Sequence, residues 1–436
     1  MAGRRSRAVA AARRTGWEAA RGPLLRSAGL LTFNFAAAAG LGFVFWVLAA
    51  RSWPPDDIGV ATALVATAMF LAGLSNLGMS FGIVRFLPAA PDRAALMNAA
   101  LTLVGMAALA VGLGFVALAG IVAPPLAVLQ TDLVLLVLFL LLVLFAATEP
   151  VAEQMFVADR RTEATTALAL LLVALRLPWP LVLASSAAPA VIVGAWALGY
   201  LVSAGVAALV LLPRAFPGYR PIPVFAFSKT APMIRFSAGN HVAGILGNAG
   251  PGLMPLLVLT LLGPGAGSSA AAHFYVAYAV ASLLYAVPTS GATALLAEGS
   301  REGPRIGRDA RRAAAWAAAL LLPATLGLLL LRDPILGFFG ASYLSASAVL
   351  VPLALVAWIL IPNSILATIL RLRLRTRHLV VCGAGSSAVA LGVAAALLPT
   401  MGLEGAGWGL LAGFATGALL ASPVLRPSPG DAPPPT

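Results

Sequence analysis

Long apolar runs dominate this 436-residue sequence, and they restrict the fold more than any other feature. Runs of 18 or more residues with few charges can cross a hydrocarbon core about 30 Å thick. Lipid offers no hydrogen-bond partners, so each run must satisfy its own backbone and is expected to be a helix. The composition agrees, since only 10% of residues are charged, against about 25% in soluble domains. The sequence therefore predicts an all-α polytopic membrane protein.

The apolar runs number about twelve, each roughly 20 residues long. They lie near 29–49, 58–82, 94–121, 133–156, 164–184, 189–212, 236–262, 271–297, 311–331, 347–370, 379–398 and 402–422.

A proline-rich, basic segment at 213–232 separates six of these runs from the other six. RSAG at 26–29 precedes the first run and RFSAG at 235–239 precedes the seventh, so the second half echoes the first. Because six is even, both halves start on the same side, which predicts a parallel repeat of two six-helix lobes around a central cavity. The expected division is a basic N-terminal segment, an N-lobe, an inter-lobe loop, a C-lobe and a proline-rich tail, at 1–28, 29–212, 213–232, 233–422 and 423–436.

Positive charge predicts the orientation of the chain. The sequence has 28 basic and 15 acidic residues. With a cytoplasmic N-terminus, 25 of the basic residues lie inside and only Arg51 and Arg332 lie outside. Cytoplasmic loops are enriched in arginine and lysine, so we expect both termini, 213–232 and 298–310 to be cytoplasmic. Orientation thus explains the charge, and no nucleic-acid partner is expected.

Cofactor chemistry finds little support in the sequence. The single cysteine, Cys382, excludes an internal disulfide, and the three histidines form no HExxH or Cys/His cluster. No GxxxxGK[ST] phosphate loop is present, so ATP hydrolysis by that route is not expected. We therefore expect no metal, no cofactor and no enzymatic activity.

Arg176 lies within the fifth run, in LLVALRLPWPLVLA, about 18 Å from its inner end at 1.5 Å per residue. A charge at such a depth should face the bundle interior or a wet cavity. One interpretation is an ion pair with Glu149 or Glu153, which are four residues apart on one helix face. The other is binding of an anionic substrate group, since a guanidinium can donate to two oxygens at once. The sequence leaves both open, and they are compatible.

Other polar residues within or beside the runs are candidates for substrate binding. Arg26 and Arg235 stand at the inner ends of the first and seventh runs, where they could bind an anionic headgroup or snorkel to the interface. Amide and imidazole side chains inside the runs could line the cavity or form interhelical hydrogen bonds. These are Asn34, Asn76, Asn240, His241 and Asn248. Glycines 405, 409, 413 and 417 recur every four residues and predict a close-packing face.

Four stretches together resemble bacterial polysaccharide and O-antigen flippases of the multidrug/oligosaccharidyl-lipid/polysaccharide exporter superfamily. They are WPPDDIGVATALVATAMFLAGLSNLGMSFGIVRFLP at 53–88, MFVADRRTEATTALALLLVALRL at 155–177, ILGFFGASYLSASAVLVPLAL at 335–355 and MGLEGAGWGLLAG at 401–413. The resemblance implies a flippase in the bacterial inner membrane, with an undecaprenyl-diphosphate-linked oligosaccharide as substrate. It also implies that a polysaccharide polymerase and glycosyltransferases of the same pathway are partners.

Three alternatives follow from the same features. A cation-coupled multidrug exporter of the superfamily usually carries an acid in its first helix, where this chain has only Thr32 and Asn34. A peptidoglycan-precursor flippase typically has fourteen helices rather than twelve. A membrane glycan ligase or polymerase should have a large outer loop with catalytic residues, and the expected outer loops here are short.

Overall fold

The computed structural model describes residues 40–263, 265–299 and 306–425, and every regular element within them is helical. Eleven helical segments of this part are long and apolar enough to cross a membrane, and they match the second to twelfth predicted runs. The first run lies mostly outside the described residues, which include only its second half as the helix Gly40–Ser52. The prediction of an all-α polytopic membrane protein is confirmed.

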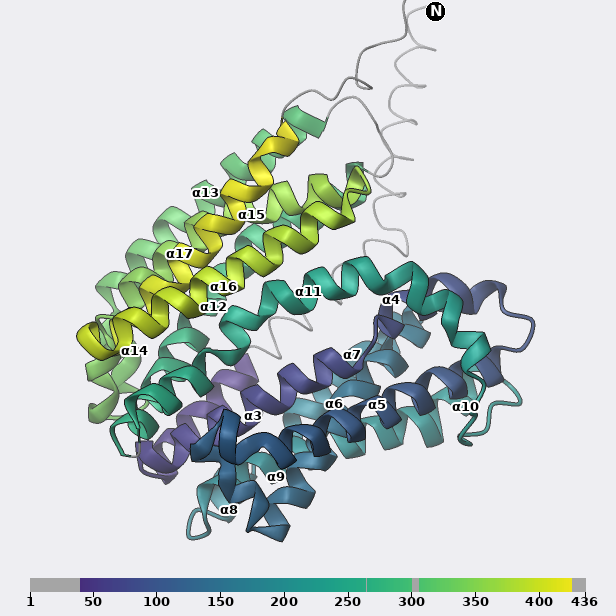
Figure 1. Cartoon of the computed structure of the whole chain (residues 1–436), viewed down its shortest axis with the longest axis horizontal. Coiled ribbons are helices and arrows are strands. Elements are labelled where there is room, and N and C mark those ends of the chain that lie inside the picture. The colour runs from purple at the N-terminus through teal and green to yellow at the C-terminus, as the bar shows by residue number, and fades with distance from the viewer. Residues whose placement is uncertain (1–39, 264, 300–305, 426–436) are drawn as a thin grey trace, which may run out of the picture.

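The described helices fall into two sets joined by a bridging helix (Figure 1). The N-lobe contains α3 to α10, and α6 packs against α3, α5 and α9. The C-lobe contains α12 to α17, and α15 packs against α12, α13 and α17. N-lobe bounds are α3 Pro55–Ser75, α4 Met79–Phe86, α5 Arg93–Val122, α6 Leu133–Ala158, α7 Thr162–Ala174, α8 Trp179–Val182, α9 Ala188–Val206 and α10 Leu212–Ala215. The bridge is α11 Phe227–Leu262, and C-lobe bounds are α12 Ala266–Gly299, α13 Ile306–Leu330, α14 Arg332–Gly337, α15 Leu350–Leu372, α16 Thr376–Met401 and α17 Leu403–Ala421.

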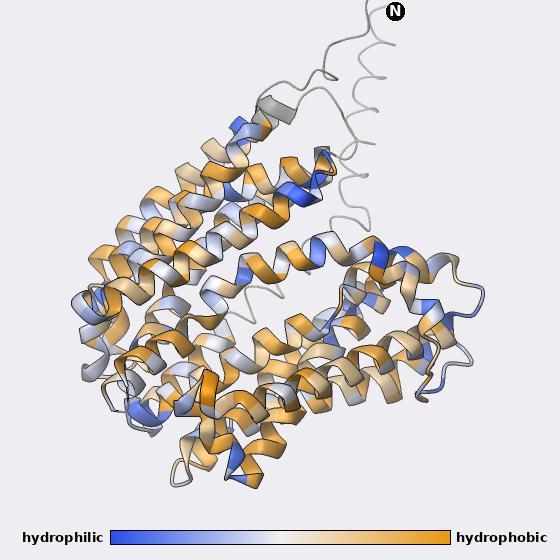
Figure 2. Ribbon diagram, in the orientation of Figure 1, coloured by the Kyte–Doolittle hydropathy of each residue, from blue (hydrophilic) through white to orange (hydrophobic). Residues whose placement is uncertain are grey.

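The two lobes meet at one end and diverge at the other (Figure 1). Figure 2 shows hydrophobic residues along the lengths of the helices and hydrophilic residues mainly near their ends, as a membrane-spanning bundle requires. The diverging end carries α4, α10 and the turn between α15 and α16, which hold basic residues predicted to be cytoplasmic. We call the diverging end inner and the meeting end outer.

Two predicted runs are interrupted in the structure. The second run breaks into α3 and α4 at Asn76–Gly78, where Leu77 and Gly78 have φ of 53° and 76°. A left-handed pair ends the hydrogen-bond ladder, and glycine is the residue that adopts this conformation without steric cost. The fifth run breaks after Ala174 because Pro178 and Pro180 lack the N–H groups that would continue the helix.

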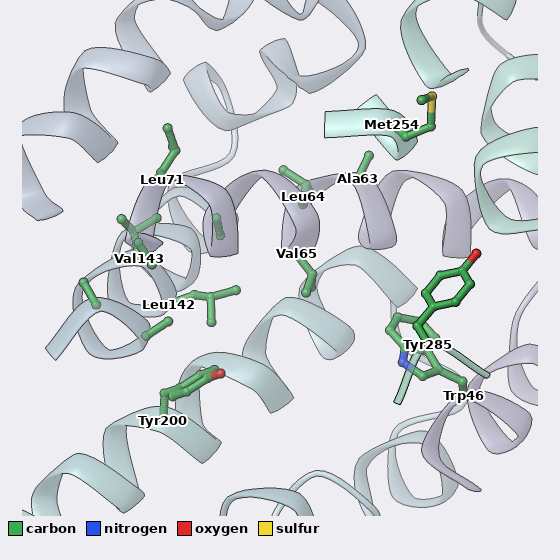
Figure 3. Close-up of a cluster of buried hydrophobic side chains, with 14 of the residues drawn as sticks. Trp46, Ala63, Leu64, Val65, Leu71, Leu142, Val143, Tyr200, Met254 and Tyr285 are labelled. Carbon is green, nitrogen blue, oxygen red and sulfur yellow. The ribbon is translucent and has the colours of Figure 1, made fainter. Parts of the chain in front are cut away.

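Side-chain packing explains the positions of α3 and α17. In Figure 3, α3 lies between Met254 of α11 and Leu142 and Val143 of α6, all of them buried. On α17, a Cβ added at the predicted glycine ladder would lie 2.5–2.8 Å from a neighbouring helix, on α16 for Gly405, Gly409 and Gly413 and at Asn363 of α15 for Gly417. These contacts confirm the close-packing face, since only glycine permits such an approach.

The bridging helix α11 is 36 residues long and contains Pro232, Pro251 and Pro255. Its backbone is opened by Ser387 of α16. The Ser387 hydroxyl accepts from the Gly250 N–H at 2.8 Å and donates to the Leu246 carbonyl. Those two groups would normally bond to each other, four residues apart, so the hydroxyl is inserted into the ladder. Such an insertion is a recognised cause of helix bending.

Candidate functional site

A cavity of about 760 Å³ lies between the lobes on the inner side of the α3–α11 contact. Its volume is within the range of small-molecule sites. Residues of α3, α6 and the α3–α4 region form one wall, and α11 and the end of α15 form the other. The described lining consists of Ala72, Gly73, Asn76, Ser80, Phe81, Ala146, Pro150, Asn240, His241, Gly244, Ile245, Asn248 and Arg371.

The N-lobe wall is organised by Asn76 at the break between α3 and α4. Its Oδ1 accepts from the Ser80 N–H at 3.3 Å, and its Nδ2 donates to the Ser80 hydroxyl at 3.0 Å and the Ala147 carbonyl at 3.4 Å. An asparagine at such a position satisfies backbone groups that a helix start leaves open. Asn76 therefore lines the cavity and also forms the interhelical hydrogen bond that the sequence left as an alternative.

The opposite wall brings Asn240, His241 and Asn248 together on α11. The His241 Nε2 lies 3.4 Å from the Leu74 carbonyl of α3, and Asn248 Nδ2 donates to the Gly244 carbonyl at 3.0 Å. The Oδ1 of Asn240 is buried and has no hydrogen-bond partner among the described residues. A buried acceptor without a partner is costly.

Arg371 is the charged residue among the described lining of the cavity. It stands in the last turn of α15, is exposed, and forms no ion pair or side-chain hydrogen bond within the part of the chain that the structure describes. It also borders a smaller C-lobe cavity of about 190 Å³ beside Asn363, Cys382 and Ser386. Sequence reasoning counted Arg371 only as an inner-loop charge. Its spacing of eight residues from Asn363, which places both on one helix face, was the signal that could have found it.

Arg176 is buried in the N-lobe, with 7% of its surface exposed, and it is not among the residues that line the cavity. Its guanidinium carbon lies 3.9 Å from the ring centre of Trp196 and 4.9 Å from that of Tyr200, both on α9. Cation–π contact of this kind partly offsets the loss of water. The Nε and Nη2 atoms have no hydrogen-bond partner among the described residues.

The predicted ion pair of Arg176 with Glu149 or Glu153 is not formed among the described side chains in this conformation. Glu149 is buried and accepts from the Ser203 hydroxyl at 2.8 Å instead. Glu153 is half-buried one helical turn further along α6. The aromatic rings of α9 take the place of the acids beside Arg176, because Trp196 and Tyr200 are four residues apart and share a helix face.

The remaining predicted site residues are less central. Arg235 is exposed near the inner end of α11 and does not line the cavity. Its neighbour Phe236 has the guanidinium of Arg85 over its ring at 4.8 Å, which links α11 to α4. Arg26 and Asn34 lie outside the described residues. Within those residues, no three histidine, cysteine or acidic side chains are grouped as metal ligands.

Comparison with known proteins gives a consistent picture. The model of a family described as polysaccharide biosynthesis protein matches residues 48–348. The fold is similar to the inward-facing conformation of a multidrug resistance MATE family transporter of the MOP superfamily, with a TM-score of 0.69 and 12% identity over 88% of this chain and 92% of that one. It is also similar to the lipid II flippase MurJ in an inward closed conformation, with a TM-score of 0.73 and 11% identity over 90% and 86%.

An outward-facing conformation of a MATE family transporter gives a TM-score of 0.63 at 13% identity, over 92% of this chain and 93% of that one. No curated protein matches the chain in sequence. At these identities the likenesses show the fold alone.

Proposed function

The chain belongs to the polysaccharide biosynthesis protein family, and we propose that it flips an undecaprenyl-diphosphate-linked oligosaccharide across the bacterial inner membrane by alternating access. The observation that carries the proposal is the chemistry of the cavity between the lobes. Its described lining combines amide, hydroxyl and imidazole groups with the charge of Arg371 and no carboxylate. Sugars need neutral donors and acceptors, and a diphosphate needs a cation.

We propose the following assignment of substrate groups. The sugar hydroxyls bind the side chains of Asn76, Asn240, His241 and Asn248. The diphosphate binds Arg371, and Arg235 on α11 adds positive charge near the inner end. Arg26, Asn34 and Arg176 join this set in other states of the cycle. The apolar tail stays in the lipid.

The cycle needs no ATP of its own. The lobes meet at the outer end and diverge at the inner end, so the present conformation would receive substrate from the cytoplasmic side. We propose cytoplasmic termini and cytoplasmic loops at 213–232 and 298–310, in agreement with the basic inner ends. A cysteine at Ser228 and one at Ala266 should then react with impermeant thiol reagents from opposite sides.

The cation-coupled multidrug exporter finds less support. Binding an organic cation or a driving cation at the cavity wall requires a carboxylate, and the described lining contains none. The positive charge of Arg371 on the cavity wall would instead repel a cationic drug. The positive lining favours an anionic lipid as the transported molecule.

Flipping by Arg371 variants tests this proposal. Proteoliposomes would hold a fluorescent undecaprenyl-diphosphate disaccharide, and dithionite quenching would report its transfer between leaflets. A charge-assisted hydrogen bond contributes about 1.5–3 kcal/mol, so Arg371→Ala should slow flipping by roughly ten-fold or more. Arg377→Ala is the matched control, because Arg377 is an exposed arginine near the same inner end that does not line the cavity. Equal rates in Arg371→Ala and wild type would refute the proposed site.

A further inference from the structure

Arg176 is a charged group that this conformation does not use. It is more than nine-tenths buried, and two of its nitrogens have no partner among the described residues. Burying an unpaired charge is costly, whereas replacing it by an apolar side chain often stabilises a protein. Retention of such a residue inside a lobe is explained if an anion reaches it at some point in the cycle.

The surroundings of Arg176 connect it to the surface between the lobes. Trp196, which lies under the guanidinium, has its ring centre 6.4 Å from that of Trp46. Trp46 in turn contacts Tyr275 of α12, with ring centres 4.5 Å apart. The guanidinium therefore stands beside a pair of aromatic rings that joins the two lobes.

Trp46 and Tyr275 belong to different lobes. The helix that carries Trp46 is fixed to the N-lobe, since the Ser52 hydroxyl donates to the Pro180 carbonyl at 3.1 Å and the Trp53 Nε1–H donates to the Ser186 carbonyl at 2.9 Å. Tyr275 belongs to the C-lobe helix α12. Separation of the lobes at this end would take Tyr275 away and leave Trp46 and Arg176 together.

The lobes are closed at the outer end by contacts to backbone atoms that we call the outer seam, formed by Arg51, Gly59, Ser268 and Phe338. The Arg51 Nε–H donates to the Phe338 carbonyl at 2.8 Å. A Cβ added at Gly59 of α3 would lie 2.5 Å from the carbonyl carbon of Ser268 of α12. An outward-open state requires this seam to separate.

We propose that Arg176 forms a second anion site, closed here by the Trp46–Tyr275 pair and opened to the outer cavity when the outer seam separates. The inference rests on the proposed function and deepens it. The diphosphate binds Arg371 in the inward-open state and Arg176 in the outward-open state. Each state thus offers one cation to the same group, and Trp196 and Tyr200 hold the guanidinium in position between turnovers.

A bulky substitution at the outer seam, a steric wedge, allows the Arg176 and Arg371 sites to be tested separately. Gly59→Ala prevents closure of the outer seam and favours the outward-open state, and Gly114→Ala, where an added Cβ meets nothing within 4 Å, is the matched control. In a Cys382→Ser background, Asn248→Cys should lose reactivity to an impermeant thiol reagent from the inside when Gly59→Ala is added. If it does not, Gly59→Leu provides the larger wedge.

Binding of farnesyl diphosphate to purified protein in nanodiscs then tests the assignment. In the wedge background, Arg176→Met should weaken binding at least ten-fold and Arg371→Ala should have little effect, and in the Gly114→Ala background the order should reverse. Inorganic pyrophosphate is the second ligand. Equal dependence on Arg176 with pyrophosphate would indicate a site for free diphosphate and overturn the lipid assignment.

Stability and access give two further readouts. Arg176→Met should melt at the wild-type temperature or above, because it removes a buried charge that has no ion pair among the described residues. Arg176→Cys should react from the outside only in the wedge background. A lower melting temperature together with unchanged binding in that background would make Arg176 a structural residue and overturn the inference. Loss of the Arg371 dependence in the control background would instead contradict the proposed function.

Discussion

Gly59 determines how closely the lobes approach at the outer end, and Gly59→Ala should shift the conformational equilibrium towards outward-open. The added Cβ would lie 2.5 Å from the carbonyl carbon of Ser268 and closer still to its oxygen. Reaching a carbon–carbon contact of about 3.5 Å requires a movement of about 1 Å. Because α3 and α12 belong to different lobes, separation of the lobes is a less costly response than deformation of either helix.

The expected size follows from the cost of overpacking. Extra methyl groups in a packed site cost about 1–3 kcal/mol, which corresponds to a shift of about 5–150-fold between two states. Gly59→Ala should therefore reduce labelling of a cysteine at Asn248 from the inner side and slow flipping by about ten-fold. Its melting temperature should change little, since the helix itself favours alanine over glycine.

Two measurements decide between this account and simple misfolding. Accessibility of Asn248→Cys is compared in Gly59→Ala and in Gly114→Ala, and the flipping rate is measured in the same two variants with Asn248 intact. Wild-type accessibility together with a wild-type rate in Gly59→Ala would show that the outer seam does not have to close, and the reasoning about the lobes would be wrong.

Three further predictions concern single contacts. Asn98→Ala removes the amide that donates to the Arg220 carbonyl at 2.7 Å, so residues 216–226 should be cleaved faster by protease in inside-out vesicles. The hydrogen bond from the Val224 N–H to the Thr102 hydroxyl, at 3.0 Å, would still hold this segment. The hydrogen bond from the Ala95 N–H, together with Lys229, holds the pKa of Asp92 below its ordinary value. The ionised Asp92 carboxylate therefore stabilises the fold above the unfolded pKa, and this stabilisation is lost as the pH falls through the lower folded pKa. Asp92→Asn can still cap α5, so its melting temperature should fall less on acidification than that of the wild type. Ser387→Ala leaves the Gly250 N–H and the Leu246 carbonyl without their shared partner and should destabilise the protein by about 1–3 kcal/mol in thermal unfolding, whereas Ser386→Ala, with no hydrogen bond to lose among the described contacts, should not.

Much of the fold could be predicted because a bilayer imposes helix length directly. Eleven of the predicted runs correspond to described helices, and α16 and α17 even carry the expected glycine contacts. The break at Asn76–Gly78 could not be predicted from apolar length, since Leu77 keeps the run hydrophobic while its φ of 53° leaves the helix. Hydropathy reports the preference of a segment for lipid and carries no information on the sign of the backbone dihedral φ.

The candidate site was predicted unevenly for a related reason. Asn76, Asn240, His241 and Asn248 are polar residues inside apolar runs, so their cost in lipid marks them out, and the structure places all four on one cavity. Arg371 has the same role in space but stands at the end of its run, where an arginine is also what membrane orientation requires. Composition cannot separate those two uses, and only the position of Arg371 on the cavity lining does.

Arg176 shows how far a sequence argument about a buried charge can reach. Its depth alone required a protein environment rather than lipid, and the structure provides one in Trp196 and Tyr200. The depth of Arg176 did not identify the groups beside it, because a guanidinium can be held by acids, carbonyls or aromatic faces. Arg176 follows the end of α7 at Ala174, and the rings beside it belong to α9. Aromatic faces hold the cation without neutralising it, so its charge stays available in a way that an ion pair with Glu149 would prevent. A charged residue that forms no ion pair with the described side chains, and that is linked through Trp196 to the contact between the lobes, is suited to bind an anion in one state and release it in the other.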